Sequence, residues 1–132
     1  DYGSTWNGKF IIRDCIFIPT GEKNKEVRII NGFNSGQHDF GYKSFMPETI
    51  IIEDLYIDDT YHQGNNENLT VFANFNTNMV SDSYQEKFPY EKTKRLVLKD
   101  ISFRSNKTLR ISKNQFMFKD LVVEGNTKYI RH

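Results

Sequence analysis

Hydrophobic and polar residues alternate in four short segments of the chain, and each segment carries an aspartate near its middle. The segments are Phe10–Phe17, Ile50–Ile57, Leu96–Phe103 and Phe116–Val123, with the aspartates at Asp14, Asp54, Asp100 and Asp120. Hydrophobic residues stand two and four positions before each aspartate, and one and three positions after it. Alternation with a period of two places these side chains on one face of a β-strand. Each segment therefore predicts a pair of short strands that meet at an aspartate bend.

Single strands with the same alternation are predicted between the bent pairs. They cover residues 27–30, 69–72 and 109–112, and Tyr129 and Ile130 lie inside a fourth. Each repeat then contains a lone strand, a connection and a bent pair, which makes three strands. A unit of this size buries its hydrophobic face by stacking on its neighbours, as in solenoid proteins.

The spacing of the aspartates predicts long loops in two of the repeats. Asp100 and Asp120 are 20 residues apart, within the range of known structural repeats, whereas the two earlier intervals span 40 and 46 residues. Those two repeats must each carry a long excursion. Binding and catalytic residues are most often found in such loops.

The inward and bend positions lead to three expectations. Cys15 falls in an inward column, which predicts a buried and unreactive thiol. The bend aspartates are expected to accept backbone N–H groups at tight turns rather than to form a metal-binding ladder. Outward positions such as Ile11, Ile16 and Tyr56 are apolar, so either the excursion at residues 74–94 or another subunit or domain is expected to cover them.

In its strand rhythm and bend residues the chain resembles the right-handed parallel β-helix (pectin-lyase-like) superfamily, which includes pectate lyases, polygalacturonases and phage tailspikes. The resemblance implies an all-β fold, a right-handed parallel β-helix of about three to four coils with long loop excursions. It implies one domain over residues 1–132, as a fragment or terminal part of a longer β-helix protein, and a secreted or surface-exposed location. The Gly-His-Gly and Arg-Ile-Lys elements of polygalacturonases are absent, and no pectate lyase motif matches.

In the resembled family, polysaccharide usually lies along the face of the lone strands, between the flanking loops. The loops that border this face here hold the candidate catalytic residues His38, Asp39, Asp58, Asp59 and His62. These side chains suit general acid and base catalysis, and the three carboxylates suit Ca²⁺. No other cofactor is expected. Whether the chain is a glycoside hydrolase, a polysaccharide lyase or no enzyme stays open.

The outward positions of the lone strands suggest what kind of sugar would bind. Arg28, Thr70 and Arg110 align, which places two guanidinium groups roughly 10 Å apart on the same face. Guanidinium groups bind carboxylates and sulfates well, so an acidic glycan is the expected ligand, unless the arginines pair with loop carboxylates instead. Tyr42 and Tyr61 are expected either to stack on sugar rings or to pack within the loops.

Charge and composition argue against two other classes of partner, nucleic acids and the membrane interior. The chain has 18 basic and 17 acidic residues and a net charge of +1, so it lacks the basic face typical of nucleic-acid-binding proteins. No run approaches the roughly 20 apolar residues of a membrane-spanning helix. The expected function is to bind or help process polysaccharide. The alternative is a structural segment of a phage tail appendage or adhesin without catalytic activity, whose partners would be further copies of the chain or adjoining β-helix coils.

Overall fold

The computed structural model describes residues 7–20, 27–30, 41–62, 69–72, 90–111 and 118–130. These residues form β-strands joined by turns and contain no helix, so the fold is all-β. Within them, therefore, no helix is long and apolar enough to cross a membrane.

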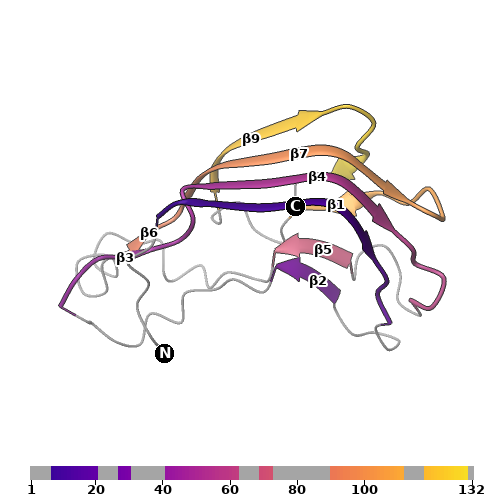
Figure 1. The fold of residues 1–132 in the computed structure, drawn as a ribbon, viewed down its shortest axis with the longest axis horizontal. Coiled ribbons are helices and arrows are strands. Elements are labelled where there is room, and N and C mark those ends of the chain that lie inside the picture. The colour runs from indigo at the N-terminus through magenta and orange to yellow at the C-terminus, as the bar shows by residue number, and fades with distance from the viewer. Residues whose placement is uncertain are drawn as a thin grey trace.

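The strands form three sheets, and every pair of neighbouring strands is parallel. The first sheet has the order β1 (Lys9–Phe17), β4 (Thr49–Ile57), β7 (Thr93–Phe103) and β9 (Phe118–Glu124). The second has the order β2 (Val27–Ile30), β5 (Leu69–Phe72), β8 (Leu109–Arg110) and β10 (Tyr129–Ile130). Figure 1 shows the strands of the first sheet arching side by side, with β2 and β5 below them.

The third sheet was not predicted from the sequence. It pairs β3 (Ser44–Phe45) with β6 (Tyr90–Glu91), just before the chain enters β4 and β7. The predicted lone strands are confirmed as the second sheet, and their register places Arg28 beside Thr70 and Thr70 beside Arg110. Each repeat thus returns the chain to the same sheet, one strand further along.

Three of the predicted bends are confirmed, each at an aspartate with a left-handed backbone. Asp14, Asp54 and Asp100 have φ angles of 52°, 49° and 51°. Aspartate tolerates this conformation better than most residues, so the strand bends without being interrupted. The carboxylate of Asp100 accepts the backbone N–H of Asn126 at 3.0 Å, which is the structural role expected of a bend residue.

The prediction that Asp120 is the fourth bend residue is wrong. Asp120 pairs with Arg95 in the middle of a strand, and the left-handed residue that follows β9 is Gly125, with φ at 68°. The error has a simple cause. Inward positions lie four and two residues before a bend and one and three after it, so a shift of five residues leaves Leu121 and Val123 inward in both registers.

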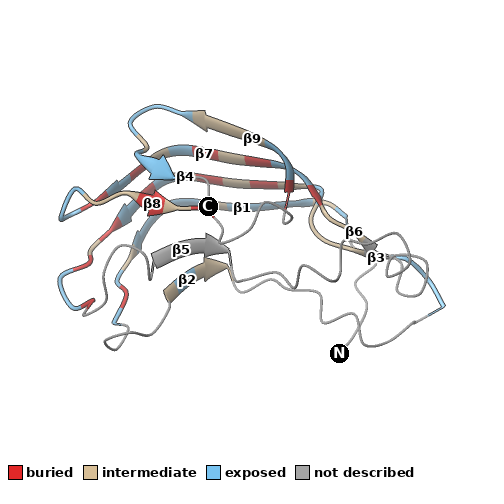
Figure 2. Cartoon of the chain, turned by 180° about the vertical axis from the view of Figure 1, so that it is seen from behind, coloured by how far each residue is buried: buried red, intermediate tan, exposed pale blue. Residues whose placement is uncertain are grey.

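The core consists mainly of the predicted inward columns. Eleven buried residues come from the strands of the first sheet and from the third lone strand: Ile50, Ile52, Leu55, Ile57, Leu96, Leu98, Ile101, Phe103, Leu109, Ile111 and Phe118. Figure 2 shows the alternation of buried and less buried positions along β4 and β7. The core therefore lies where the central strands of the first sheet face the second sheet.

The prediction that Cys15 is buried is wrong. Its side chain is exposed, and its Sγ donates to the carbonyl of Arg13 at 3.0 Å. Cys15 occupies the same column as the buried Leu55, but β1 is the first strand of its sheet and has only β4 beside it among the described strands. The outward Ile11 and Ile16 of β1 are 50% and 69% exposed. Residues 74–89 of the excursion expected to cover them lie outside the described residues.

Candidate functional site

Two successive turns at the end of the first sheet bring the predicted acidic residues together with basic ones. One turn follows β4 at residues 58–62, and the other follows β7 at residues 104–108. The N–H of Asp58 donates to the carbonyl of Phe17, and the N–H of Arg104 donates to the carbonyl of Ile57, both at 2.9 Å. Each turn is thereby held against the end of the preceding bent strand, which stacks the two turns.

Asp59 fastens the two turns to each other. Its side chain is buried, and one carboxylate oxygen accepts the backbone N–H of Ser105 at 3.2 Å while the other accepts the Ser105 hydroxyl. The ammonium of Lys107 lies 3.7 Å from the same carboxylate. Burial alone would raise the pKa of Asp59, but the two hydrogen bonds from Ser105 outweigh it and lower that pKa. Asp59 is therefore an anion at neutral pH.

Asp58 is held by its own turn. Its Oδ1 accepts the hydroxyl and the backbone N–H of Thr60, the latter at 3.2 Å, and these hydrogen bonds lower the pKa of Asp58. The guanidinium of Arg104 lies 3.8 Å from that oxygen and also donates to the Thr60 hydroxyl. Asp58 therefore also carries a negative charge at neutral pH, and its charge is partly compensated by Arg104.

His62 lies under the same turn. Its backbone N–H donates to the carbonyl of Asp59 at 3.2 Å, and its side chain is buried. Burial, together with the nearby Lys107, lowers the pKa of His62 more than Asp59 raises it, so the ring is neutral at pH 7. Its Nε2 is buried without a hydrogen-bond partner among the residues that the structure describes.

The structure thus brings together three of the five predicted catalytic residues, Asp58, Asp59 and His62. His38 and Asp39 lie outside the described residues. A glycosidase needs one carboxyl group that holds a proton at neutral pH, and such a group has a raised pKa. Asp58 and Asp59 both have lowered pKa values and are engaged within the turns, an arrangement that suits structure better than acid catalysis.

The predicted substrate-binding residues lie in different parts of the fold. Arg28 and Arg110 share a column of the second sheet, and Arg28 is exposed while Arg110 is half-buried, with its Nε enclosed and without a hydrogen-bond partner among the described residues. Tyr61 is 66% exposed in the turn after β4, and Tyr42 is 45% exposed just before β3. In the part of the chain that the structure describes, no three acidic, histidine or cysteine side chains gather as a metal site.

A cleft of about 350 Å³, which was not predicted from the sequence, lies beside the third sheet. It is lined by nine residues: Asn7, Lys43, Phe45, Met46, Glu48, Glu91, Lys92, Lys94 and Lys119. They come from the segment before β1, from both strands of the third sheet and the residues next to them, from the segment entering β4, and from the first residues of β7 and β9. Only the pairing of β3 with β6, which sequence analysis missed, brings Lys43 and Phe45 beside Glu91.

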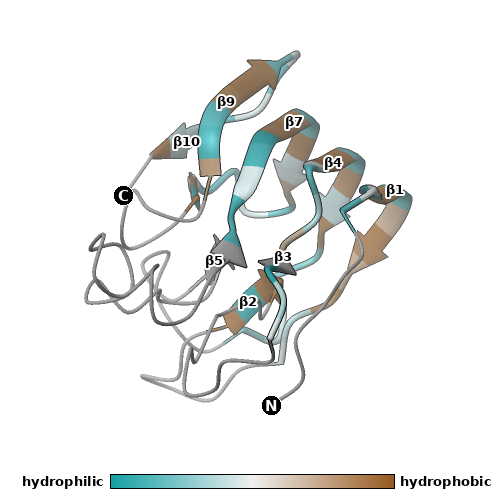
Figure 3. Cartoon of the chain, turned by 90° about the vertical axis from the view of Figure 1, so that its left-hand side faces the viewer, coloured by the Kyte–Doolittle hydropathy of each residue, from teal (hydrophilic) through white to brown (hydrophobic). Residues whose placement is uncertain are grey.

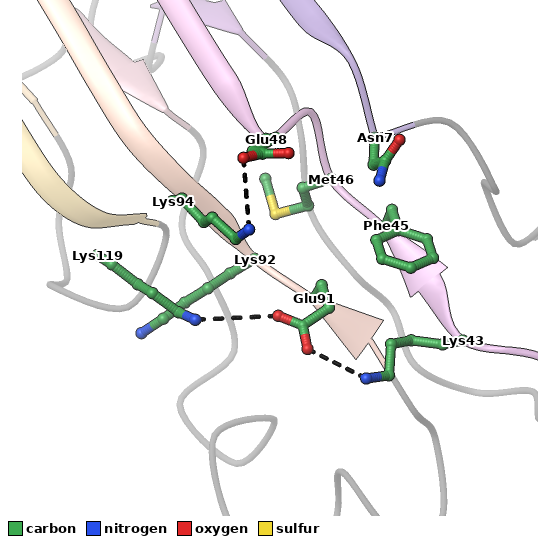
Figure 4. A pocket seen from close by; sticks show the side chains of 9 residues that line it. All are labelled: Asn7, Lys43, Phe45, Met46, Glu48, Glu91, Lys92, Lys94 and Lys119. Atoms are coloured by element: carbon green, nitrogen blue, oxygen red, sulfur yellow. Dashed lines mark hydrogen bonds and ion pairs between the residues drawn. The ribbon is translucent and has the colours of Figure 1, made fainter.

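Positive charge exceeds negative charge in this cleft. Four lysines face two glutamates, which leaves a formal excess of two positive charges. Glu91 is shared between Lys43 at 3.1 Å and Lys119 at 3.9 Å, whereas Glu48 pairs with Lys94 at 3.3 Å (Figure 4). Lys92 has no ion-pair partner among the described residues. The cleft is suited to a ligand that carries negative charge.

The chain was compared with models of protein families, with curated proteins and with solved structures, and none of them matches it.

Proposed function

We propose that this chain is a right-handed parallel β-helix that binds an acidic polysaccharide, and that the lysine-lined cleft is its main anion-binding site. The observation that carries the proposal is the combination in one concave site of two uncompensated positive charges with the apolar side chains of Phe45 and Met46. Sugar rings present apolar C–H faces that pack on aromatic side chains, and uronate or sulfate groups bring the negative charge. A secreted or surface-exposed location would suit such a ligand.

The charges of the cleft are arranged so that an incoming anion gains from them. Glu91 cannot fully neutralise both Lys43 and Lys119, and Lys92 adds a further charge on the same side (Figure 4). A carboxylate or sulfate placed here would form charge-assisted hydrogen bonds without first breaking the Lys94 pair with Glu48. Because the lysines are at least partly exposed, salt should weaken this binding.

The column of Arg28, Thr70 and Arg110 offers a second contact for a long polymer. Its two arginines are separated by an uncharged residue, whereas the first sheet has the column Arg13, Glu53, Lys99 and Glu124, in which the charges alternate. Alternating charges compensate one another along the column. The arginine column has no such alternation of charge.

We propose binding rather than cleavage for the described residues. The hydrogen bonds that hold Asp58 and Asp59 as anions also tie them to Thr60 and Ser105 in the turns, so neither has a proton to give to a leaving group. The buried His62 is neutral, but its ring is enclosed.

The test is a calorimetric titration with polygalacturonate, with a neutral glucan as the control ligand. Replacing two cleft lysines, Lys92→Gln and Lys119→Gln, should weaken the binding of polygalacturonate about tenfold or more, because two charge-assisted contacts are lost. The matched variant, Lys99→Gln with Lys128→Gln, removes the same charge away from the cleft and should bind nearly as the native chain does. Equal loss in both variants would mean that net charge alone drives binding, and no binding by the native chain would overturn the proposal.

A second pair of variants tests the arginine column. Arg28→Lys with Arg110→Lys keeps the charge but removes the two-pronged guanidinium geometry. If the polymer reaches this column, its affinity should fall several-fold while the binding of a single galacturonate unit in the cleft stays unchanged. A column that serves only to keep the face soluble would leave both affinities as they were.

A further inference from the structure

The two end strands of the first sheet carry complementary sequences. Strand β1 begins with a lysine, three apolar residues and an arginine at positions 9–13, and β9 ends with an aspartate, three apolar residues and a glutamate at positions 120–124. Both stretches lie in the same columns of the sheet, because residues 9, 49, 95 and 120 are in register, as are residues 13, 53, 99 and 124. The two edges therefore match position by position, with opposite charges.

These two strands are also the outermost described strands of the sheet. Among the described strands, β1 pairs only with β4 and β9 only with β7, and Figure 3 shows them on opposite sides of the sheet. An edge strand presents a row of backbone N–H and C=O groups that another strand can bind. Apolar side chains are left bare at the β1 edge, where Phe10 is 39% exposed and Ile11 is 50% exposed, whereas Ile50 in the same column as Phe10 is 1% exposed.

We propose that copies of this chain stack head to tail, with β1 of one copy adding in parallel to β9 of the next. In the register that continues the sheet, Lys9 of one copy meets Asp120 of the other, and Arg13 meets Glu124. Phe10, Ile11 and Ile12 then meet Leu121, Val122 and Val123. Cross-strand pairs of opposite charge and of apolar residues are the contacts that stabilise a sheet. The junction repeats the arrangement already present between β7 and β9, where Arg95 meets Asp120 and Lys99 meets Glu124.

The same charges argue against symmetric pairing. If two β1 edges met, in either direction, lysine and arginine would face lysine and arginine, and two β9 edges would bring acidic residues together. Charged residues on an edge strand usually prevent such contacts. Because the two edges here differ in sign, they exclude the symmetric dimers and still allow the head-to-tail contact. A contact of this kind is heterologous and does not close on itself, so it produces a filament.

The second sheet is compatible with this junction. Strand β10 lies in the same repeat as β9, and its Tyr129 and Ile130 are 42% and 45% exposed. In the continued stack, β2 of the first copy would lie beside β10 of the next, with Val27 beside Tyr129. The exposed apolar residues at both ends of the chain would therefore be covered by the same contact.

The test measures the size of the native chain by sedimentation velocity over a range of protein concentrations at low salt. Size should increase with concentration, and added salt should reduce it. Lys9→Glu should weaken association about tenfold, because position 9 then repels Asp120 across the junction. Lys9 neighbours the uncharged Thr49 within its own chain, so this change leaves the fold intact. Lys92→Glu makes the same change of charge in the cleft and should assemble as the native chain does.

A charge exchange decides whether the register is the proposed one. Asp120→Lys alone should also weaken association, and Lys9→Glu combined with Asp120→Lys should restore it, because the pair is again opposite in charge. Asp120 also lies beside Arg95 within its own chain, so its replacement could disturb the fold. Circular dichroism and thermal unfolding therefore check that each variant is folded, and Asp120→Asn serves as a milder replacement. A native chain that stays monomeric at every concentration overturns the proposal, and so does a folded combined variant that is not rescued.

Discussion

Strands β1 and β4 have nearly the same pattern of residues, yet β1 is mostly exposed whereas the inward residues of β4 are buried. Ile12 and Ile52 are the same residue in the same column, but Ile52 is fully buried and Ile12 is only half-buried. Cys15 is exposed where its neighbour Leu55 is buried. The difference comes from position in the sheet, because among the described strands β4 has a neighbour on each side and β1 has one.

The comparison shows that alternation fixes the face of a strand but not the depth of its side chains. Period-two patterning determines which side chains point to the core side, and this holds equally for both strands. Burial depends in addition on the neighbouring strand that covers each residue. A side chain of a given column should therefore contribute more to the free energy of unfolding in the centre of the stack than at its end.

The largest expected effect is a difference in lost stability when the same isoleucine-to-alanine change is made at two positions of one column. Ile52→Ala should lower the free energy of unfolding by about 3–4 kcal/mol, because it removes a fully buried side chain and leaves a cavity. Ile12→Ala, in the same column, should lower it by only about 1–2 kcal/mol, since that side chain is already partly hydrated. Chemical denaturation of the two variants at low protein concentration measures both values.

The proposed assembly sharpens this difference. Ile12 would be covered by the neighbouring copy, so the effect of Ile12→Ala should increase at protein concentrations where the native chain associates, while that of Ile52→Ala should not. Equal losses for the two variants at low concentration would contradict the idea that β1 is an open edge.

A second, smaller effect is expected at the bends, where the last repeat uses Gly125 in place of aspartate. Gly125→Ala should lower the free energy of unfolding by about 2 kcal/mol, because φ is 68° and an added Cβ would lie 1.8 Å from Oδ1 of Asp100. Gly41→Ala is the matched control, since φ there is 76° but no atom of another described residue lies within 4 Å of the added Cβ. Thermal unfolding should show a clearly smaller loss for Gly41→Ala.

The contribution of the contact can be isolated with a third variant. Asp100→Ala removes the carboxylate that a Cβ on residue 125 would meet, so the losses from Asp100→Ala and Gly125→Ala should not be additive. Additive losses would show that backbone strain alone limits residue 125.

The sequence was sufficient to predict the lone strands, three bends and most of the core, because these depend on local alternation. It could not distinguish Asp120 from Gly125 as the fourth bend, since a shift of five residues preserves the inward pattern. The burial of Cys15 was mispredicted because burial depends on a neighbouring strand. The lysine cleft depends on the two-residue strands β3 and β6, which are too short to show alternation and which bring Lys43 beside Glu91 across 48 positions.

The candidate site was predicted in composition but not in its interactions. Placing Asp58, Asp59 and His62 in one loop required only their nearness in sequence. The hydrogen bonds of Asp58 to Thr60 depend on the local geometry of its own turn, and those of Asp59 to Ser105 depend on how two turns stack 46 residues apart. Both sets keep the carboxyl groups ionised.

The smallest expected effect concerns the turn after β4, where burial extends from the strand to His62. The pKa of His62 in the folded state lies below the ordinary value of 6.5. Between these two pKa values the folded state therefore binds fewer protons than the unfolded state. Stability should therefore be complete above pH 6.5 and should fall as the pH drops toward the folded pKa. In His62→Gln this part of the pH dependence should be missing, as measured by denaturation between pH 7 and about 5. If the native chain and the variant show the same slope, His62 is accessible to water and protons in solution, and the burial that distinguishes β4 from β1 ends with the strand.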